Sequence, residues 1–285
     1  MRTRAIHPRS TRQGEPRMDI QFDFTGKKVV IFGGTTGINF GIAEAFAAHG
    51  AAVVVVSRKR DNVDAAIARL DVHGVPVGGF VADVRDMRAV EEVFESIRTE
   101  WGAIDVLISG AAGNFLAEAS ALSSNGFKVV VDIDLNGTFH VMRAGLDYLA
   151  PGASVINITA PQASIPVRYQ AHVCAAKAGV DQLTRVLALE WGAKGIRVNA
   201  IAPGPIAGTE GMARLTPHDD GAAIKTVPLG RLGTKDDVAG LAMFLSSSAA
   251  RYISGAIIPC DGGGSGESVL QIQEAGRFLA AAAQQ

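Results

Sequence analysis

The stretch Lys28-Val-Val-Ile-Phe-Gly33-Gly-Thr-Thr-Gly37-Ile-Asn39 decides the fold. Its first five residues form an apolar run that predicts a buried strand, and the glycines that follow lead into a helical pattern. A glycine-rich turn between a strand and a helix presents backbone N–H groups that can hold a pyrophosphate. The stretch therefore predicts a strand–turn–helix unit able to bind a dinucleotide.

Six further apolar runs follow along the chain. They are Ala52–Ser57, Val77–Val81, Val106–Ser109, Ser154–Ile158, Arg197–Ala202 and Ala256–Pro259. The four valines at 53–56 show no polar alternation, which is typical of a strand buried on both faces of a parallel sheet. Helical patterns such as Arg88–Thr99 separate the runs, and Thr234-Lys-Asp-Asp237 resembles a capping box. The order predicts an α/β fold, with a single Rossmann-type doubly wound sheet of about seven parallel strands and helices on both faces.

Composition and charge exclude several classes of protein. With 48% hydrophobic residues among 285, the chain has ample material for a buried core. A net charge of −1 argues against a nucleic-acid partner, which usually demands a basic face. No apolar run approaches the ~20 residues that span a bilayer, so we expect no membrane segment. The two cysteines lack metal-ligand spacing, so we expect no metal site and reduced thiols.

The end of the second predicted strand bears on the cofactor. Ser57-Arg58-Lys59 holds no carboxylate, whereas NAD-binding proteins use one there for the ribose 2′-hydroxyl. Arg58 can instead pair with a 2′-phosphate. We therefore expect NADPH as the cofactor, and a solvated surface charge is the alternative role for Arg58.

Landmarks from about residue 24 to residue 264 resemble the short-chain dehydrogenase/reductase family. They are the glycine turn, Asn199 in Arg-Val-Asn-Ala and the closing Asp261-Gly-Gly. Asn39 replaces the last glycine of the family's Gly-x-x-x-Gly-x-Gly pattern, which puts the close approach of helix and strand in question, and Gly41 is expected to relieve it. The resemblance implies a nicotinamide cofactor and a homotetramer.

The resemblance also implies the cofactor contacts. Asp83-Val84 resembles the pair that meets the adenine, and Pro203-Gly-Pro-Ile206 resembles the segment whose backbone meets the nicotinamide carboxamide. The expected cofactor-binding residues are Gly33, Thr35, Thr36, Gly37, Ile38, Arg58, Asp83, Val84, Ala111, Lys177, Pro203, Gly204 and Ile206.

One landmark of the family is missing. Lys177 matches the lysine of Tyr-x-x-x-Lys, but Val173 occupies the tyrosine position and Ala160 the position of the catalytic serine. Valine cannot give a proton to an alkoxide, so ketone reduction is disfavoured. Reduction of a conjugated thioester instead places the proton on carbon and negative charge on the thioester oxygen, which needs hydrogen-bond donors rather than a phenol.

The branch follows from two stretches that resemble the 2,4-dienoyl-CoA reductases, the peroxisomal type most closely. They are Ala111-Ala-Gly-Asn-Phe115-Leu and Asp132-Ile-Asp134-Leu-Asn136-Gly-Thr-Phe. That type also lacks the tyrosine and has an aspartate at the position of Asp134. The mitochondrial type has its tyrosine at the position of Gln162. The resemblance implies NADPH-dependent reduction of a carbon–carbon double bond in an acyl-CoA substrate, 2,4-dienoyl-CoA foremost.

Three other functions remain open. Reduction of trans-2-enoyl-CoA is the nearest, because those peroxisomal reductases share His172. A cofactor-binding pseudoenzyme would bind NADPH and turn over no acyl-CoA. A ketone reductase would have to use Tyr169 as its acid.

The resemblance implies roles for the catalytic residues. Lys177 would bond the ribose hydroxyls of the nicotinamide half, and Asp134 would hold the proton-donating water or merely cap backbone groups. Asn136 would bond the thioester oxygen or merely pack.

Four substrate-binding residues are implied as well. Asn114 and Phe115 would line the acyl pocket, Arg85 would meet a CoA phosphate or be a surface charge, and His172 would face the substrate or pack.

The ends of the chain and one long segment complete the expectations. Residues 1–17 hold five arginines and no apolar pattern, so we expect a disordered or mis-annotated leader before an NADP-binding domain over residues 18–285. Residues 204–228 are rich in Gly, Pro and Thr and predict a substrate lid, with a long surface loop as the alternative. The final Ala-Gln-Gln is no peroxisomal tripeptide, and a cytoplasmic location is expected.

Overall fold

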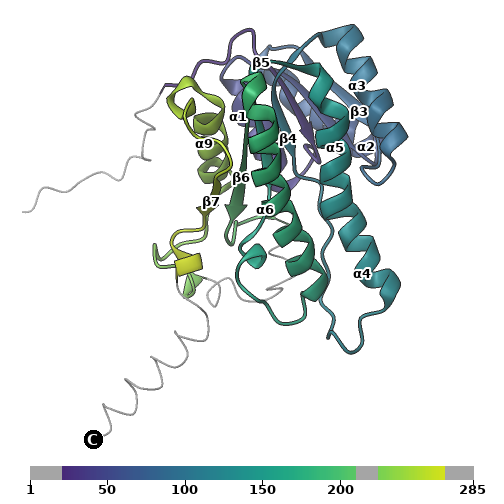
Figure 1. Cartoon of the computed structure of the whole chain (residues 1–285). Coiled ribbons are helices and arrows are strands. Elements are labelled where there is room, and N and C mark those ends of the chain that lie inside the picture. Colours follow the sequence, from purple (N-terminus) through teal and green to yellow (C-terminus); the bar gives the residue numbers. More distant parts are fainter. Residues whose placement is uncertain (1–20, 210–223, 267–285) are drawn as a thin grey trace, which may run out of the picture.

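The computed structural model describes residues 21–209 and 224–266, and Figure 1 shows their arrangement. The predicted leader and residues 210–223 of the predicted lid lie outside the described residues. Seven parallel strands form one sheet in the order β3-β2-β1-β4-β5-β6-β7, which confirms the predicted doubly wound fold. The strands are β1 (Lys28–Phe32), β2 (Ala52–Ser57), β3 (Val77–Val81), β4 (Ile104–Ser109), β5 (Leu149–Ile158), β6 (Arg197–Pro203) and β7 (Ile257–Cys260).

Helices cover both faces of this sheet. The principal ones are α1 (Gly37–Ala48), α2 (Arg60–Leu70), α3 (Met87–Trp101), α4 (Ser124–Val131), α5 (Gly137–Gly145), α6 (Ala171–Trp191) and α9 (Lys235–Ser246). The side chains of α1, α2 and α9 pack into one buried cluster, and those of α3, α5 and α6 pack into the other. Each cluster fills one face of the sheet.

The valines of β2 show why these residues form a central strand. Val53 and Val55 belong to the core on the α1 side, whereas Val54 and Val56 belong to the core on the α3 side. Successive side chains of a strand point to opposite faces, so a strand covered on both faces must be apolar at every position. The uninterrupted valine run is therefore a consequence of burial on both sides.

Strand β5 is longer than the sequence predicts. It begins at Leu149 rather than at Ser154, and its pairing with β4 shifts register between Ile104 and Val106. Its first residues include Pro151 and Gly152, which are depleted in strands. A search for apolar runs therefore does not detect this part of the strand. The capping box of α9 is confirmed, because Thr234 and Asp237 bond each other's backbone.

The strand order places the functional end of the sheet. The chain runs outward from β1 through β2 to β3 and then returns to β4 on the other side of β1. Ligands of such sheets bind at this reversal, outside the carboxyl ends of the strands. Phe32 of β1 pairs with both Val56 of β2 and Ser109 of β4, so the turns that follow these three strands meet. Figure 1 shows α4 and one end of α6 extending past this edge of the sheet.

Candidate active site

A cleft of about 980 Å³ opens at the carboxyl ends of the strands. It is lined by residues from the turns after β1, β2, β3, β4, β5 and β6, and by the first turns of α6. Most of the predicted site residues line this one cleft. They are Gly33, Thr35, Thr36, Gly37, Ile38, Arg58, Asp83, Val84, Ala111, Asn114, Asp134, Lys177, Pro203, Gly204 and Ile206.

The glycine turn after β1 forms one wall of the cleft. Gly33 has φ +78°, and a Cβ there would come within 2.8 Å of the backbone nitrogen of Ala111, so a side chain is excluded. Gly37 has φ +59° and open space where its Cβ would stand. The N-cap residue Thr36 makes no side-chain hydrogen bond to the first turn of α1, and that turn carries no acidic residue. Backbone N–H groups at a helix N-terminus, with no acidic residue in the first turn, suit a phosphate group.

Asn39, which stands in place of the third glycine of the family pattern, is accommodated between α1 and the end of β4. Its side chain is buried, and its Nδ2 donates a 2.7 Å hydrogen bond to the carbonyl oxygen of Gly110 at the end of β4. A Cβ on Gly110 would lie 2.3 Å from that Nδ2, so Gly110 makes room for the larger side chain. Gly41 has another purpose, because its missing Cβ allows α1 to pack against Lys235 of α9. The fit of α1 against the end of β4 therefore depends on Asn39 and Gly110 together.

The adenosine end of the cleft lies beyond β2 and β3. Arg58 and Lys59 are exposed side chains on the cleft wall, and Asp83 faces them from the end of β3. Arg85 binds Asp83 with its guanidinium group, with Nη2 2.5 Å from Oδ2, and does not line the cleft. These hydrogen bonds from Arg85 hold the pKa of the Asp83 carboxyl below its usual value, and the charge of Arg58 adds to the effect.

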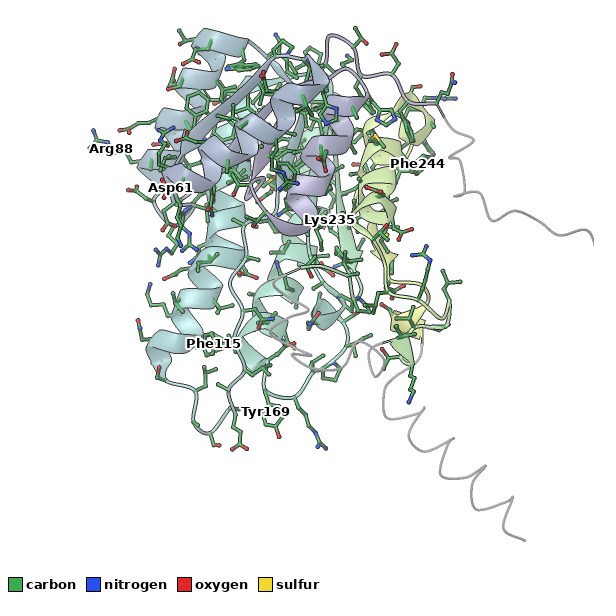
Figure 2. The ribbon with its side chains drawn as sticks, turned by 180° about the vertical axis from the view of Figure 1, so that it is seen from behind. Asp61, Arg88, Phe115, Tyr169, Lys235 and Phe244 are labelled. Carbon is green, nitrogen blue, oxygen red and sulfur yellow. The ribbon has the colours of Figure 1, made fainter. Side chains whose placement is uncertain are left out.

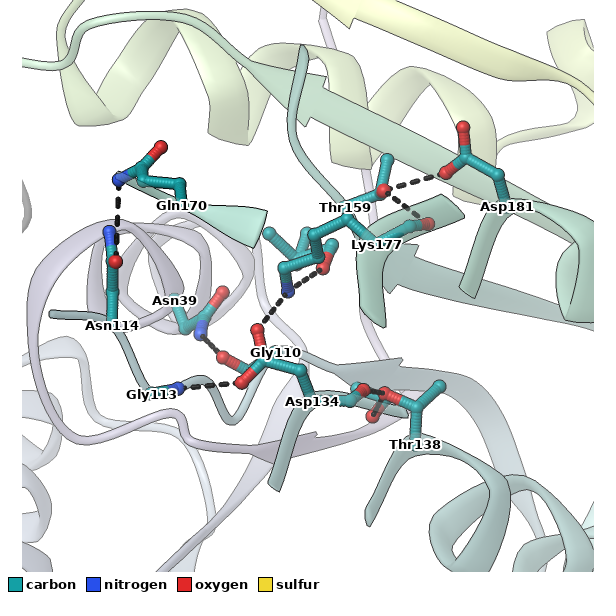
Figure 3. A network of polar contacts seen from close by, with 12 residues as sticks. Asn39, Gly110, Gly113, Asn114, Asp134, Thr138, Thr159, Gln170, Lys177 and Asp181 are labelled. Atoms are coloured by element: carbon teal, nitrogen blue, oxygen red, sulfur yellow. Dashed lines mark hydrogen bonds and ion pairs between the residues drawn. The ribbon is translucent and has the colours of Figure 1, made fainter. Parts of the chain in front are cut away.

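A buried ion pair forms the floor of the cleft (Figure 3). Lys177 Nζ lies 3.1 Å from Asp134 Oδ2, and the two side chains are only 7% and 1% exposed. Lys177 also donates to the carbonyl oxygen of Ile158 at 3.2 Å, and Asp134 Oδ1 accepts a 2.7 Å hydrogen bond from the Gly113 backbone. Asp134 is thus held by a cation and by a loop amide, while its backbone carbonyl accepts from Thr138.

A π-helical turn positions this aspartate. Residues Asp132–Asn136 form the turn, between α4 and α5 and continuous with both. Such single turns insert an extra residue into a helix and occur frequently at functional sites. The turn brings Asp134 inward, whereas Asn136 is exposed and donates to Asp132 Oδ1 at 2.9 Å. Asn136 does not line the cleft, so its predicted contact with substrate gains no support from the geometry.

Val173 and Ala160 both line the cleft near Lys177. Neither side chain can donate a hydrogen bond. The positions that carry hydroxyl acids in the pattern of a ketone reductase are therefore apolar walls here. Thr159, the adjacent hydroxyl, is buried and donates to Asp181 Oδ1 at 2.6 Å. Asp181 lies one helical turn beyond Lys177, and burial raises the pKa of its carboxyl.

Three amides are joined at the other end of the cleft. Gln162 donates to Gln170 Oε1 at 3.0 Å, and Gln170 donates to Asn114 Oδ1 at 3.3 Å. Gln162 and Asn114 line the cleft, and Gln170 is fully buried behind them. No local pattern in the sequence points to a site role for Gln162 or Gln170, because their link depends on contacts between separate loops.

The remaining predicted residues lie around this end. Phe115 is partly exposed and its ring centroid is 4.4 Å from that of His172, whose two ring nitrogens are buried without a hydrogen-bond partner among the described residues. Neither residue lines the cleft. Tyr169 is exposed, has φ +66°, and its carbonyl oxygen accepts from Ala117 at 3.0 Å. Figure 2 shows Phe115 and Tyr169 at the same end of the molecule.

The described residues contain no metal cluster, no disulfide and no membrane-spanning helix. No cluster of three or more His, Cys, Asp or Glu side chains stands ready to hold a metal ion there, and Cys174 and Cys260 form no disulfide. Within those residues, no helix has both the length and the apolar character needed to cross a membrane.

Comparison with known proteins gives consistent results. The family model described as Enoyl-(Acyl carrier protein) reductase matches residues 33–265. The chain is 42% identical over 250 residues to the peroxisomal 2,4-dienoyl-CoA reductase of Arabidopsis thaliana, covering 84% of each chain. It is 40% identical to a probable 2,4-dienoyl-CoA reductase of Bacillus subtilis, covering 83% of this chain and 96% of that one.

A solved structure is similar as well. A short chain dehydrogenase from Bacillus anthracis matches with a TM-score of 0.75 and 40% identity. The match covers 84% of this chain and 96% of that one.

Proposed function

This chain belongs to the short-chain dehydrogenase/reductase family, and from that premise we propose that it reduces a 2,4-dienoyl-CoA with NADPH. The observation that carries the proposal is the buried Lys177–Asp134 pair in a cleft whose usual hydroxyl acids are replaced by Val173 and Ala160. This arrangement retains a cation beside the cofactor wall and offers no phenol to an alkoxide. It suits the reduction of a carbon–carbon double bond.

The residues present fit an NADPH molecule. The cradle at Gly33 excludes a Cβ, and the first turn of α1 offers N–H groups to a pyrophosphate. Arg58 and Lys59 stand on the cleft wall, and Ser57-Arg58-Lys59 at the end of β2 holds no carboxylate, so a 2′-phosphate would meet positive charge there. When bound, NADPH supplies the hydride.

The protein itself must stabilise the negative charge on the thioester oxygen and deliver a proton to carbon. After hydride addition to the far end of a conjugated thioester, negative charge collects on the thioester oxygen, and hydrogen-bond donors aimed at that oxygen lower the barrier. Asn114 and Gln162 are neutral amides that line the same cleft as Lys177, and both are oriented by Gln170. They take this role in our proposal in preference to Asn136, whose side chain lies outside the cleft.

The proton must reach carbon rather than oxygen. Asp134 lines the cleft, and its Oδ2 accepts no hydrogen bond from a described residue besides its ion pair with Lys177. The ion pair with Lys177 and the hydrogen bond from Gly113 fix the orientation of this carboxylate. We propose that Asp134 positions the water that protonates the substrate.

The names of the relatives favour the dienoyl substrate over its rival. Proteins about 40% identical to this chain, from a plant and a bacterium, are named as 2,4-dienoyl-CoA reductases. Reduction of trans-2-enoyl-CoA in the same cleft remains the alternative, since both reactions place charge on a thioester oxygen. A cofactor-binding pseudoenzyme is the other alternative.

Assembly and location are further proposals. Phe139 on α5 and Val186 and Leu189 on α6 are large apolar side chains exposed to solvent, and Leu189 is 83% exposed. Their exposure supports association with a second copy, and we propose a homotetramer, which light scattering can test. A cytoplasmic location stays a prediction. Several relatives are named peroxisomal, so microscopy of the tagged chain should decide between the two compartments.

A turnover panel tests the proposed function. The unmodified protein is mixed with NADPH and, in separate reactions, with 2,4-hexadienoyl-CoA, trans-2-hexenoyl-CoA and several ketones, and NADPH absorbance is followed. We expect the dienoyl thioester to be the best substrate and the ketones to be poor. Rapid oxidation of secondary alcohols with NADP⁺ would refute the proposal. Tight NADPH binding with no thioester turnover would establish the pseudoenzyme.

A further inference from the structure

Asn39 carries a polar atom that nothing described in the protein satisfies. Asn39 is 8% exposed and lines the cleft, and its Oδ1 is buried without a hydrogen-bond partner among the described residues. A buried acceptor left without a donor costs about 1–3 kcal/mol. Such an atom in a ligand cleft is a candidate for a contact that forms only when the ligand binds.

The orientation of this side chain is fixed by chemistry. Only the amide nitrogen of Asn39 can bond the carbonyl oxygen of Gly110, because two carbonyl oxygens at 2.7 Å would repel each other. The oxygen must therefore point elsewhere. Figure 3 shows it turned away from the Gly110 carbonyl, and Asn39 is one of the residues that line the cleft.

The position of Asn39 limits what could supply the missing donor. Asn39 belongs to the helix after β1, and Gly110 follows β4, so their bond spans the point where the strand order reverses. A dinucleotide crosses the sheet at this point, with its pyrophosphate on the helix N-terminus and a ribose on either side. Pyrophosphate oxygens carry no proton at neutral pH and cannot donate. The ribose hydroxyls can.

We infer that Asn39 Oδ1 accepts a hydrogen bond from a ribose hydroxyl of the bound cofactor, and that Gly110 is required to seat it. Asn39 is then a binding residue in a position where the family pattern has a glycine with no side chain. The inference rests on the proposed binding of NADPH. It adds a cofactor contact made by Asn39, which replaces the last glycine of the family pattern.

Gly110 completes the pair. A Cβ there would lie 2.3 Å from Nδ2 and 2.5 Å from Oδ1 of Asn39, both far inside van der Waals contact. Alanine at this position would push the carboxamide out of place. The two residues should therefore act as one unit, although they are 71 positions apart in the sequence.

The test is a double-mutant cycle on cofactor binding. Dissociation constants of NADPH are measured by fluorescence for the unmodified protein, Asn39→Ala, Gly110→Ala and the double variant. We expect Asn39→Ala and Gly110→Ala each to weaken NADPH about 10-fold, the effect of one lost buried hydrogen bond. The double variant should be no weaker than Asn39→Ala. Additive losses would mean that the methyl group strikes the ligand itself, and would overturn the pairing.

Two fragments show which ribose is bound. Adenosine 2′,5′-bisphosphate carries the ribose of the adenine side, and nicotinamide mononucleotide carries the other. Weaker binding of either fragment to Asn39→Ala supports the inference and assigns the contact. Unchanged affinity for NADPH and for both fragments overturns it, whereas failure of the unmodified protein to bind NADPH would instead overturn the proposed function.

A matched control separates binding from folding. Asn157 is also a buried asparagine whose Oδ1 has no partner among the described residues and whose Nδ2 is bonded, in this case to Thr184, and it does not line the cleft. Asn157→Ala should lower the melting temperature and leave NADPH affinity unchanged. Equal losses of affinity in Asn39→Ala and Asn157→Ala would point to a general structural effect and would count against the inference.

Discussion

Replacing Asp134 by asparagine is the most informative perturbation of the buried ion pair. Asparagine has nearly the shape of aspartate, so its oxygen can still accept the hydrogen bond from Gly113, while the charge that faces Lys177 is lost. The substitution therefore separates the role of the charge from the role of the side-chain shape.

The magnitude follows from the burial of the pair. With side chains 7% and 1% exposed, Lys177 and Asp134 are screened very little by water. Removing one partner of such a pair costs about 3–5 kcal/mol. Because Lys177 keeps its hydrogen bond to the Ile158 carbonyl, we expect the lower end, about 3 kcal/mol, or a fall of roughly 6–12 °C in melting temperature. If the aspartate also positions the proton-donating water, turnover should fall about 10²-fold or more.

Calorimetry and single-turnover kinetics on the same preparation give both quantities, with NADPH affinity as a third. NADPH affinity should hardly change, because Lys177 and the glycine turn remain. Asp132→Asn is the matched control, since Asp132 lies in the same π-turn, outside the cleft. It should keep full turnover.

Two outcomes would refute the reasoning. A stable Asp134→Asn protein with normal turnover would leave Tyr169 or His172 as the acid. A destabilised protein with normal turnover would make Asp134 structural only. Adding Lys177→Met to Asp134→Asn should recover stability, because it removes the unpaired buried charge.

For three further substitutions, the structure predicts the direction of the change in cofactor preference or in melting temperature. Arg58→Ala should erase most of a preference of at least ~10-fold for NADPH over NADH, and equal binding of both by the unmodified protein would contradict this. Arg85 lowers the pKa of Asp83, so the stability it contributes is present above the usual carboxyl pKa and is lost as pH falls through the lowered one; Arg85→Ala should therefore melt lower than the unmodified protein at neutral pH, and the difference in melting temperature should shrink as pH falls through that range. Burial raises the pKa of Asp181, so its ionisation opposes folding as pH rises above the usual value; Asp181→Asn should melt higher at neutral pH, with the difference vanishing in acid, and a lower neutral melting temperature would contradict this.

The fold was predictable because its signals are local. A strand buried on both faces must be apolar throughout, and the valine run of β2 shows this directly. The glycine turn and the capping box of α9 are likewise short patterns with a backbone cause. The start of β5 was missed, because Pro151 and Gly152 give no strand signal and only the pairing of Leu149 with β4 reveals it.

The site was predictable where residues follow strand ends and not where side chains meet across loops. The carboxyl ends of parallel strands converge, so Arg58, Asp83 and Ala111 had to share an edge. The amide chain from Gln162 through Gln170 needed three separate segments in register. Asn136 bonds Asp132 four residues before it and lies outside the cleft lining, so its predicted contact with substrate stays a prediction.

Because of the π-turn at Asp132–Asn136, the packing of this segment depends more on its number of residues than on the identity of each residue. Each residue of an α-helix advances about 100° around the axis, so one extra residue changes the angular phase between α4 before it and α5 after it. Deleting a single codon there would leave every neighbouring side chain chemically intact. It would nevertheless swing either the apolar stripe of α5 away from the sheet or Asp134 away from Lys177. Natural relatives should therefore differ by many substitutions along the segment from α4 through α5, but by very few insertions or deletions there.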